Sequence, residues 1–175
     1  MKSSFLAIAL LLLPGCAAYQ VGTGSLYAPD VSTVFVPMIE SESFRRDLGE
    51  RLTEALVKEI ELKTPYKVVA DPNADSVLLV RLQGDTRGVL AENALDDPRV
   101  LEETLRAEVT WLNRRQLPMM QAQSIPTEGA LAGLAVGVGQ TGLTIPEAAQ
   151  TLTSTQQEAI KRLAEQIVGT MERPW

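Results

Sequence analysis

The sequence predicts an α+β fold: a two-layer sandwich in which two helices pack on one face of a mainly four-stranded sheet, in the order β-α-β-β-β-α. Two segments, around residues 43–62 and 144–171, have the apolar periodicity of amphipathic helices. The segments between them show no strand–helix alternation of the kind that builds a parallel sheet. With 175 residues, of which 45% are hydrophobic, the chain can bury one ordinary core. We therefore expect a single domain over residues 31–175.

The first strand and the first helix are predicted from a change of period. Val31–Met38 (VSTVFVPM) is rich in β-branched residues and is bounded by acidic residues, which is typical of a strand. Apolar residues then recur on one helical face, with Ala55 and Leu62 closing the stripe. Its main members are Phe44, Leu48, Leu52, Leu56 and Ile60. We expect Ser41 or Ser43 to begin this helix, and the helix to end before Pro65.

Three further strands are predicted in the middle of the chain. Tyr66–Val69 (YKVV) is a short strand candidate, and residues 70–75 have the composition of a turn. Ser76–Leu82 (SVLLVRL) predicts a central strand, followed by a break at 83–85 and a second piece over Arg87–Leu90.

The segment Arg99–Asn113 fits two periods. Leu105, Ala107, Val109 and Trp111 alternate with polar residues, as in a strand. Leu101, Leu105, Val109 and Leu112 could instead line a helix. We favour a strand because Val, Thr and Trp concentrate in the second half of the segment.

Residues 116–143 have the least distinctive pattern. The small-residue run over 127–142 is interpreted as a Gly-rich strand or a loop, and an exposed apolar segment that docks on a partner is the alternative. The last helix is expected to begin at Thr144, because Thr144 and Glu147 have the spacing of a capping box and Pro146 fits a first turn. An interruption at 153–155 is left open.

The N-terminus has the pattern of an export signal. The apolar run from Phe5 to Leu13 is nine residues long and would span only ~14 Å, about half of a ~30 Å hydrocarbon core. It is therefore interpreted as a signal peptide over residues 1–15 and not as a membrane span.

Cys16 is the predicted lipidation site. Leu13-Pro14-Gly15-Cys16 resembles the bacterial lipobox, and a lone cysteine in an exported chain cannot form an internal disulfide. Acyl chains such as palmitate on Cys16 would hold the protein on a membrane almost irreversibly. Residues 16–30 would then form a lipidated tether, and Ala17 in place of an aspartate favours the outer membrane. The alternative is a secreted protein with Cys16 free or removed.

The composition argues against most hydrolases and zinc enzymes. The chain has no histidine, so it lacks the most common general base and the most common metal ligand. The acidic pairs Asp96-Asp97 and Glu102-Glu103 are interpreted as solvated charge, and no acidic residues have calcium-loop spacing. Residues 137–142 spell GxGxxG, but they precede a helix without a clear strand before them. We expect no enzyme activity, cofactor or metal site, and the net charge of −6 disfavours nucleic acid.

Together these features resemble a known family. The lipobox, the strand VSTVFVPMIE, the helix FRRDLGERLTEALVKEIE and the segment TPYKVVADPNADSVLLVRLQG resemble the LptE family of lipopolysaccharide-assembly lipoproteins. The similarity covers residues 16–84 and resumes in the VTWLN strand and the ending AIKRLAEQIVGTMERPW. Periplasmic lipoprotein scaffolds of the LpoB and CsgG types, which act in cell-wall synthesis or secretion, share this architecture and are the alternative.

The resemblance implies a location, partners and binding residues. It implies a lipid-anchored protein on the periplasmic side of the outer membrane, which plugs a large β-barrel translocon of the LptD type and assists lipopolysaccharide delivery to the cell surface. Such a role needs basic residues for lipopolysaccharide phosphates. The arginines on or beside the predicted strands are the candidates, and each could instead form an ordinary intrachain ion pair. They are Arg81, Arg87, Arg106, Arg114 and Arg115.

Overall fold

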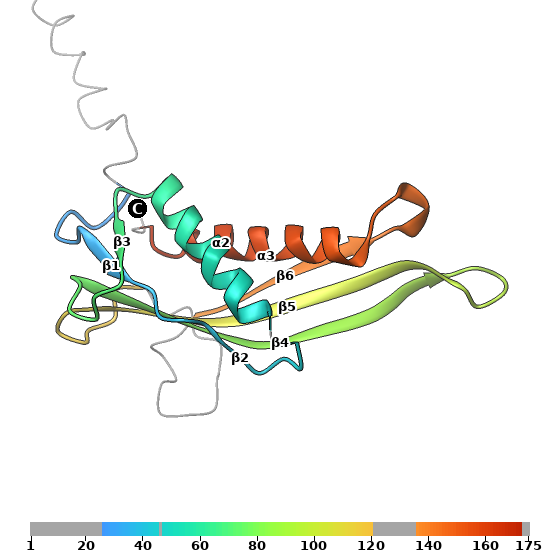
Figure 1. The fold of residues 1–175 in the computed structure, drawn as a ribbon, viewed down its shortest axis with the longest axis horizontal. Coiled ribbons are helices and arrows are strands. Elements are labelled where there is room, and N and C mark those ends of the chain that lie inside the picture. The colour runs from blue at the N-terminus through green and yellow to red at the C-terminus, as the bar shows by residue number, and fades with distance from the viewer. Residues whose placement is uncertain (1–25, 46, 121–135, 173–175) are drawn as a thin grey trace, which may run out of the picture.

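A computed structural model describes residues 26–45, 47–120 and 136–172 and confirms the α+β fold, with two helices on one face of a mixed sheet (Figure 1). The sheet has six strands, in the order β3-β1-β4-β5-β6, and β2 also pairs with β4. It is larger than predicted because β2 and β6 join the four expected strands. The elements are β1 Thr33–Phe35, β2 Glu40–Ser41, α2 Leu48–Lys63, β3 Lys67–Val69, β4 Ser76–Glu92, β5 Pro98–Asn113, β6 Val136–Thr144, the short 3-10 helix η2 Pro146–Ala148, and α3 Leu152–Gly169.

The sheet combines a parallel edge with a long antiparallel meander. Strand β1 runs parallel to both β3 and β4, whereas β4, β5 and β6 are successive antiparallel neighbours. The β4–β5 hairpin pairs from Ser76 opposite Asn113 to Glu92 opposite Pro98. Its far end extends beyond the helices (Figure 1).

The first helix begins later than predicted. Its N-cap position is Asp47, not Ser41 or Ser43. Ser41 lies in β2, paired with Leu82, and the Ser43 hydroxyl donates a hydrogen bond to Asp85, so both serines have other partners. The helix ends at Lys63, before Pro65, as expected.

The predicted apolar stripe is correct in its centre and wrong at both ends. Leu48, Leu52, Leu56 and Ile60 are buried, whereas Phe44 and Leu62 are exposed. Phe44 lies before the helix begins, so the helical periodicity does not apply to it.

The predicted break after Leu82 is a register shift within one strand. Strand β4 continues from Ser76 to Glu92, and the pairing with β5 shifts between Leu82 and Gly84. A β-bulge places one extra residue in a strand without ending it. The sequence around Gly84 therefore marks an irregularity in the ladder and not a turn.

The segment with two possible periods is strand β5, as favoured, and the four apolar residues of the alternating pattern are buried, together with Thr110 of the opposite face. The end of the Gly-rich run forms strand β6, with Gly142 facing α3. Residues 121–135, which include the first part of the Gly-rich run, lie outside the described residues.

The last helix begins seven residues later than predicted. Thr144 ends strand β6, and its buried hydroxyl has no hydrogen-bond partner among the described residues. Pro146 begins the short helix η2, which ends at Ala148 and is followed by Ala149 with a left-handed backbone (φ 58°). The capping box is formed by Thr151 and Ser154. Residues 153–155 therefore lie in the first turn of α3 and do not interrupt it.

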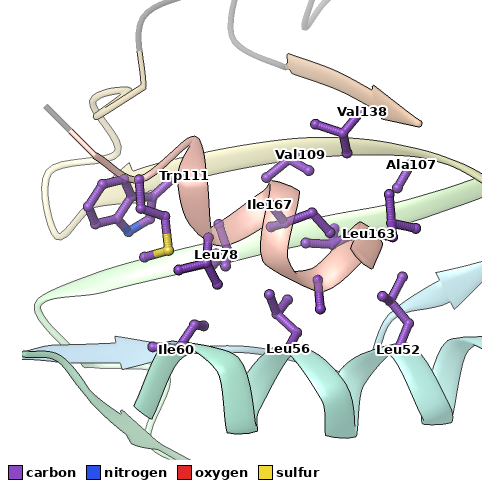
Figure 2. Packing of buried hydrophobic residues seen from close by; sticks show 14 of the residues in the cluster. Leu52, Leu56, Ile60, Leu78, Ala107, Val109, Trp111, Val138, Leu163 and Ile167 are labelled. Atoms are coloured by element: carbon purple, nitrogen blue, oxygen red, sulfur yellow. The ribbon is translucent and has the colours of Figure 1, made fainter. Parts of the chain in front are cut away.

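The core lies between the helices and the sheet. Figure 2 shows apolar side chains of α2 and α3 facing those of β4, β5 and β6. The labelled residues are Leu52, Leu56, Ile60, Leu163, Ile167, Leu78, Ala107, Val109, Trp111 and Val138. None of the helices in the described part of the chain is long and apolar enough to cross a membrane.

Aromatic residues close one end of the core. The rings of Tyr27 and Tyr66 lie 5.6 Å apart, and those of Tyr66 and Trp111 lie 5.7 Å apart. The backbone N–H of Ala28 donates to the Tyr66 hydroxyl at 2.8 Å. The segment that leads into β1 is therefore packed against the domain from Tyr27 onward.

Candidate interaction surfaces

The five candidate arginines lie at three separate places. Arg81 and Arg106 point away from the helices, because they alternate with the buried residues of β4 and β5. We call this the outer face of the sheet. Arg87 lies on the opposite, inner face, and Arg114 and Arg115 lie in the turn after β5. Of the five candidates, the structure therefore brings together two pairs. Arg81 and Arg106 lie on the outer face of the sheet, and Arg114 and Arg115 lie in one turn.

On the outer face, two arginines are diagonal neighbours. Arg81 lies opposite Glu108 in the β4–β5 ladder, and Arg106 is two residues along β5 from Glu108. The Arg81 side chain is 57% exposed and contacts Glu40 at 3.7 Å, which is a weak ion pair in solvent. Arg106 is exposed and forms no ion pair within the described ranges. Both cations are available to a ligand.

A shallow hollow lies beside Arg81. It has a volume of about 330 Å³, and Pro37, Met38 and Leu79 supply its apolar lining. Arg81 and Glu108 contribute charged groups to the same hollow. The outer face thus offers a cation next to an apolar depression.

On the inner face, a cluster of charged side chains surrounds Glu103. Its side chain is 2% exposed, and its Oε1 atom accepts from Arg45 at 2.9 Å, Arg87 at 3.1 Å and Gln156 of α3 at 2.9 Å. Arg45 also contacts Asp85 at 3.3 Å. A buried carboxylate requires such partners, because desolvation of the charge is costly. Arg87 therefore neutralises Glu103, which makes it a poorer ligand contact than Arg81 or Arg106.

The turn after β5 has one bound and one unbound arginine. Arg114 contacts Asp75 at 3.3 Å and donates to the carbonyl of Asn73 at 2.9 Å. The pKa of Asp75 is lowered from its usual value of 3.8, mainly because the backbone N–H of Ser32 and the Thr33 side chain donate to its carboxylate. Arg115 is exposed and makes no ion pair with any described residue.

Exposed apolar side chains gather at one end of the molecule. The β4–β5 turn and the β6–η2–α3 connection lie at this end, opposite the first described residues and the end of α3 (Figure 1). We call these residues the apolar end. They are Val89, Leu90, Leu95, Leu143, Ile145 and Leu152. Apolar side chains grouped on a surface mark interaction sites in soluble proteins.

Sequence reasoning missed two features of these surfaces. It assigned Phe44 to the core, although an acid at position 47, a residue type common at N-caps, could have placed the helix start after Phe44. It also gave no reason to expect exposure of Val89 and Leu90, because strand patterns do not show how far a hairpin extends beyond its helices.

Neither the predicted lipidation site nor a metal site can be built from the described residues. Cys16 lies outside them. Within residues 26–45, 47–120 and 136–172, no group of His, Cys, Asp or Glu side chains could hold a metal ion.

Comparisons with known proteins identify a family and a fold. A family model described as LptE, lipopolysaccharide-assembly, matches residues 31–173. The hypothetical protein CT253 from Chlamydia trachomatis has a similar fold, with 8% identity, a TM-score of 0.53, and coverage of 79% of this chain and 94% of that chain. No curated protein matches the chain.

Two further solved structures resemble it less closely in TM-score. Rare lipoprotein B from Shewanella oneidensis is 17% identical, with a TM-score of 0.44 and coverage of 80% of this chain and 93% of that chain. The PelC dodecamer from Paraburkholderia phytofirmans is 12% identical, with a TM-score of 0.46 and coverage of 86% and 93%.

Proposed function

Because this chain belongs to the LptE family of lipopolysaccharide-assembly lipoproteins, a family without enzymatic activity, we propose that it is anchored in the outer membrane and assists the delivery of lipopolysaccharide to the cell surface. The observation that carries this proposal is the family match over residues 31–173, which spans nearly all of the folded chain.

The anchor would be a lipid on Cys16. In this proposal residues 1–15 are a signal peptide, residues 16–30 are the tether, and residues 31–175 are the domain. The hydrogen bond from the Ala28 N–H to the Tyr66 hydroxyl supports a short tether, because the described chain is already fixed to the domain at that point. Ten residues, 16–25, then separate the lipid from Leu26, a reach of at most ~35 Å. The domain would therefore stay close to the periplasmic surface of the membrane.

The partner would be a large β-barrel translocon of the LptD type. The apolar end supports this, because it offers exposed apolar side chains that a partner protein could bury (Figure 1). Burying apolar area of this kind is the main favourable contribution to most protein association.

The lipopolysaccharide phosphates would contact arginine side chains. Arg81 and Arg106 have the best geometry of the five candidates, because they are exposed neighbours on the outer face and are weakly paired or unpaired. Arg115 is a further exposed candidate. Arg87 and Arg114 already bind carboxylates, so we assign them a smaller part.

The test is recovery of the protein from its own membranes. The full lipidated chain, tagged at its C-terminus, is purified in mild detergent, and co-purifying proteins and lipopolysaccharide are quantified. We expect a large outer-membrane β-barrel at one copy per chain. Cys16→Ala is the matched variant for the anchor, and we expect it in the soluble fraction.

The outcomes distinguish the possible functions. A cell-wall synthase or a ring of identical chains, with no barrel, would favour a scaffold of the LpoB or CsgG type. If the barrel is recovered, we expect Arg81→Ala/Arg106→Ala to reduce the lipopolysaccharide recovered with it. Arg162→Ala, which removes an exposed arginine of α3, should leave it unchanged. Equal recovery from both variants would refute the arginine assignment.

A further inference from the structure

The two edges of the sheet differ in how they are protected. Strand β3, at one edge, is three residues long and carries Lys67, whose side chain is 73% exposed. Strand β6, at the other edge, is nine residues long and contains no charged residue and no proline. Its pairing with β5 has no register shift. Short length, lysine, proline and bulges are the features that keep an edge strand from pairing with another chain, and β6 has none of them.

Hydrogen bonds at the end of β5 show which backbone groups face β6. Residues 117–119 lie beside β5 on the side away from β4, because Leu112 pairs with Pro118 on this side. The N–H of Met119 donates to the carbonyl of Trp111, and the N–H of Asn113 donates to the carbonyl of Leu117, both at 2.9 Å. Odd-numbered residues at this end of β5 therefore direct their N–H and C=O groups away from β4.

The same alternation identifies the unpaired backbone groups of β6. In an antiparallel ladder, bonded and non-bonded residue pairs alternate. The odd-numbered residues of β5 lie opposite even-numbered residues of β6, as Leu105 lies opposite Gln140. The odd-numbered residues of β6 therefore direct their N–H and C=O groups outward, where no strand within the described residues pairs with them. They are Gly137, Gly139, Thr141 and Leu143.

A groove lies between this edge and α3, which runs beside β6 (Figure 1). It has a volume of about 260 Å³ and is lined by Leu143 of β6 and by Ser154, Glu158 and Arg162 of α3. Glu158 and Arg162 bind each other at 3.1 Å, and each side chain is about half exposed. The wall of the groove is therefore polar but carries no net charge.

The position of α3 restricts what can pair with this edge. A Cβ atom at Gly142 would lie 2.8 Å from the Thr155 side chain and 3.3 Å from the Thr155 carbonyl oxygen, so α3 lies directly over β6. Two copies joined through β6 would have these strands about 5 Å apart. Their α3 helices would then be closer than the about 8–10 Å that packed helices require. The edge therefore fits a strand that has no helix above it, and not a second copy of this chain.

We propose that the free edge of β6 binds an extended segment of a partner protein as an additional strand of the sheet. The outward N–H and C=O groups of β6 would supply the main-chain hydrogen bonds. Alternate side chains of the segment would be polar and uncharged, to fit the groove beside α3. Those between them would be apolar and would cover Gly137 and Gly139 on the outer face. This inference goes beyond the lipopolysaccharide role, because it rests on backbone groups and not on the arginines.

The test is site-specific photocrosslinking in the intact cell. Gly137→benzoylphenylalanine, Gly139→benzoylphenylalanine and Thr141→benzoylphenylalanine are introduced one at a time into the full lipidated chain. After irradiation, the captured residues are mapped by mass spectrometry. We expect all three probes to capture one segment of one protein, with the captured residue shifting by two for each shift of two along β6. Lys67→benzoylphenylalanine, on the protected edge strand β3, is the control and should not capture this segment.

Proline substitutions test the role of the backbone. Thr141→Pro removes an outward N–H, so it should lower the yield of the adduct from position 139 by about tenfold. Thr141→Val keeps the N–H and should leave the yield unchanged, although it also loses the contact between the Thr141 and Thr104 hydroxyls. Thr141→Pro should melt within about 4 °C of Thr141→Val. Gln140→Pro should melt at a clearly lower temperature, because it removes an N–H that pairs with β5.

Several results would overturn the proposal. They are the absence of adducts from all three β6 positions, captured residues without the two-residue spacing, and adducts with lipid or with a second copy of this chain. An adduct yield that Thr141→Pro does not reduce would show that the partner binds without strand pairing. Equal melting temperatures of Thr141→Pro and Gln140→Pro would refute the assignment of the outward backbone groups.

Discussion

At the scale of single residues, Glu103 joins the sheet, the β2–α2 loop and α3. Replacing it with glutamine keeps the shape but removes the charge that Arg45 and Arg87 neutralise. Both arginines are about one-third exposed and can be hydrated, so the cost is limited. We expect Glu103→Gln to lower the free energy of unfolding by about 2 kcal/mol, the cost of a charged buried hydrogen-bond group.

Urea denaturation followed by circular dichroism measures this loss. The control is Glu102→Gln, because Glu102 is the neighbouring acid on the outer face and pairs with no arginine in the described ranges. The free energy of unfolding of this control should stay within about 0.5 kcal/mol of that of the parent. Equal losses in the two variants would show that the Glu103 cluster adds no stability.

The lowered pKa of Asp75 predicts that the stability of the fold depends on pH. Its pKa is lower in the folded protein than its usual value of 3.8, chiefly because the N–H of Ser32 and the Thr33 side chain donate to it. A lowered pKa stabilises the fold at pH values above 3.8, and this stability is lost as the pH falls through the folded-state pKa. We expect Asp75→Asn to be less stable than the parent at neutral pH, with a difference that shrinks as the pH falls.

The measurement is urea denaturation of both proteins from about pH 6 to about pH 3, the range in which aspartate takes up its proton. Comparing the two proteins cancels the contributions of carboxylates that they share, such as Glu54 and Glu61, whose pKa values are also lowered. A constant difference across this range would contradict the assignment to Asp75.

At the scale of elements, α2 packs very closely on the segment before it. A Cβ atom at Gly49 would lie 2.3 Å from the carbonyl oxygen of Ile39, which is backbone and cannot move aside. Gly169, the last residue of α3, has no atom within 4 Å of the same position. We expect Gly49→Ala to cost about 1–3 kcal/mol through overpacking. Gly169→Ala should instead be neutral or stabilising by up to ~1 kcal/mol.

Thermal or urea denaturation compares the stabilities of the two variants directly. Both add one methyl group to a helical glycine, so their intrinsic helix propensities change alike. If Gly49→Ala is as stable as Gly169→Ala, α2 does not approach Ile39 as the structure shows.

The elements differ in how much of them the sequence could predict. Strand β5 was identified because alternation places Leu105, Ala107, Val109 and Trp111 on one buried face. The start of α3 was misplaced because Thr144 and Glu147 satisfy the local capping pattern, whereas Thr144 ends an antiparallel strand held by β5. Pairing with a distant strand overrides a local signal, and a single sequence does not show it.

The same limit applies to the candidate sites. Local chemistry identified arginines that could bind phosphate, but their pairing depends on residues far away in sequence. Arg87 meets Glu103 and Arg114 meets Asp75 only after the sheet has formed. Phe44 was assigned to the core because it lies four residues before Leu48. Its exposure follows from the late start of α2.

At the scale of the whole molecule, the two ends have different surfaces. One end holds the aromatic group of Tyr27, Tyr66 and Trp111 and receives the chain from the N-terminus. The other is the apolar end, which extends beyond the helices (Figure 1). The Glu103 cluster lies where the apolar core gives way to this extension. In a protein tethered at its N-terminus, the anchored segment and the apolar end therefore occupy separate surfaces of the domain.

This arrangement predicts that the apolar end can be changed without loss of the fold. Leu90 and Leu95 are exposed in the β4–β5 hairpin, so Leu90→Asp/Leu95→Asp should leave the melting temperature unchanged. In the membrane pull-down, the same variant should recover at least about tenfold less barrel protein, the loss expected when apolar interface anchors are replaced. Leu62→Asp, at an exposed position near the end of α2, is the control and should recover the barrel normally. Normal recovery by the double variant would place the partner on another surface, and reduced recovery by both would show that exposed charge impairs assembly in general.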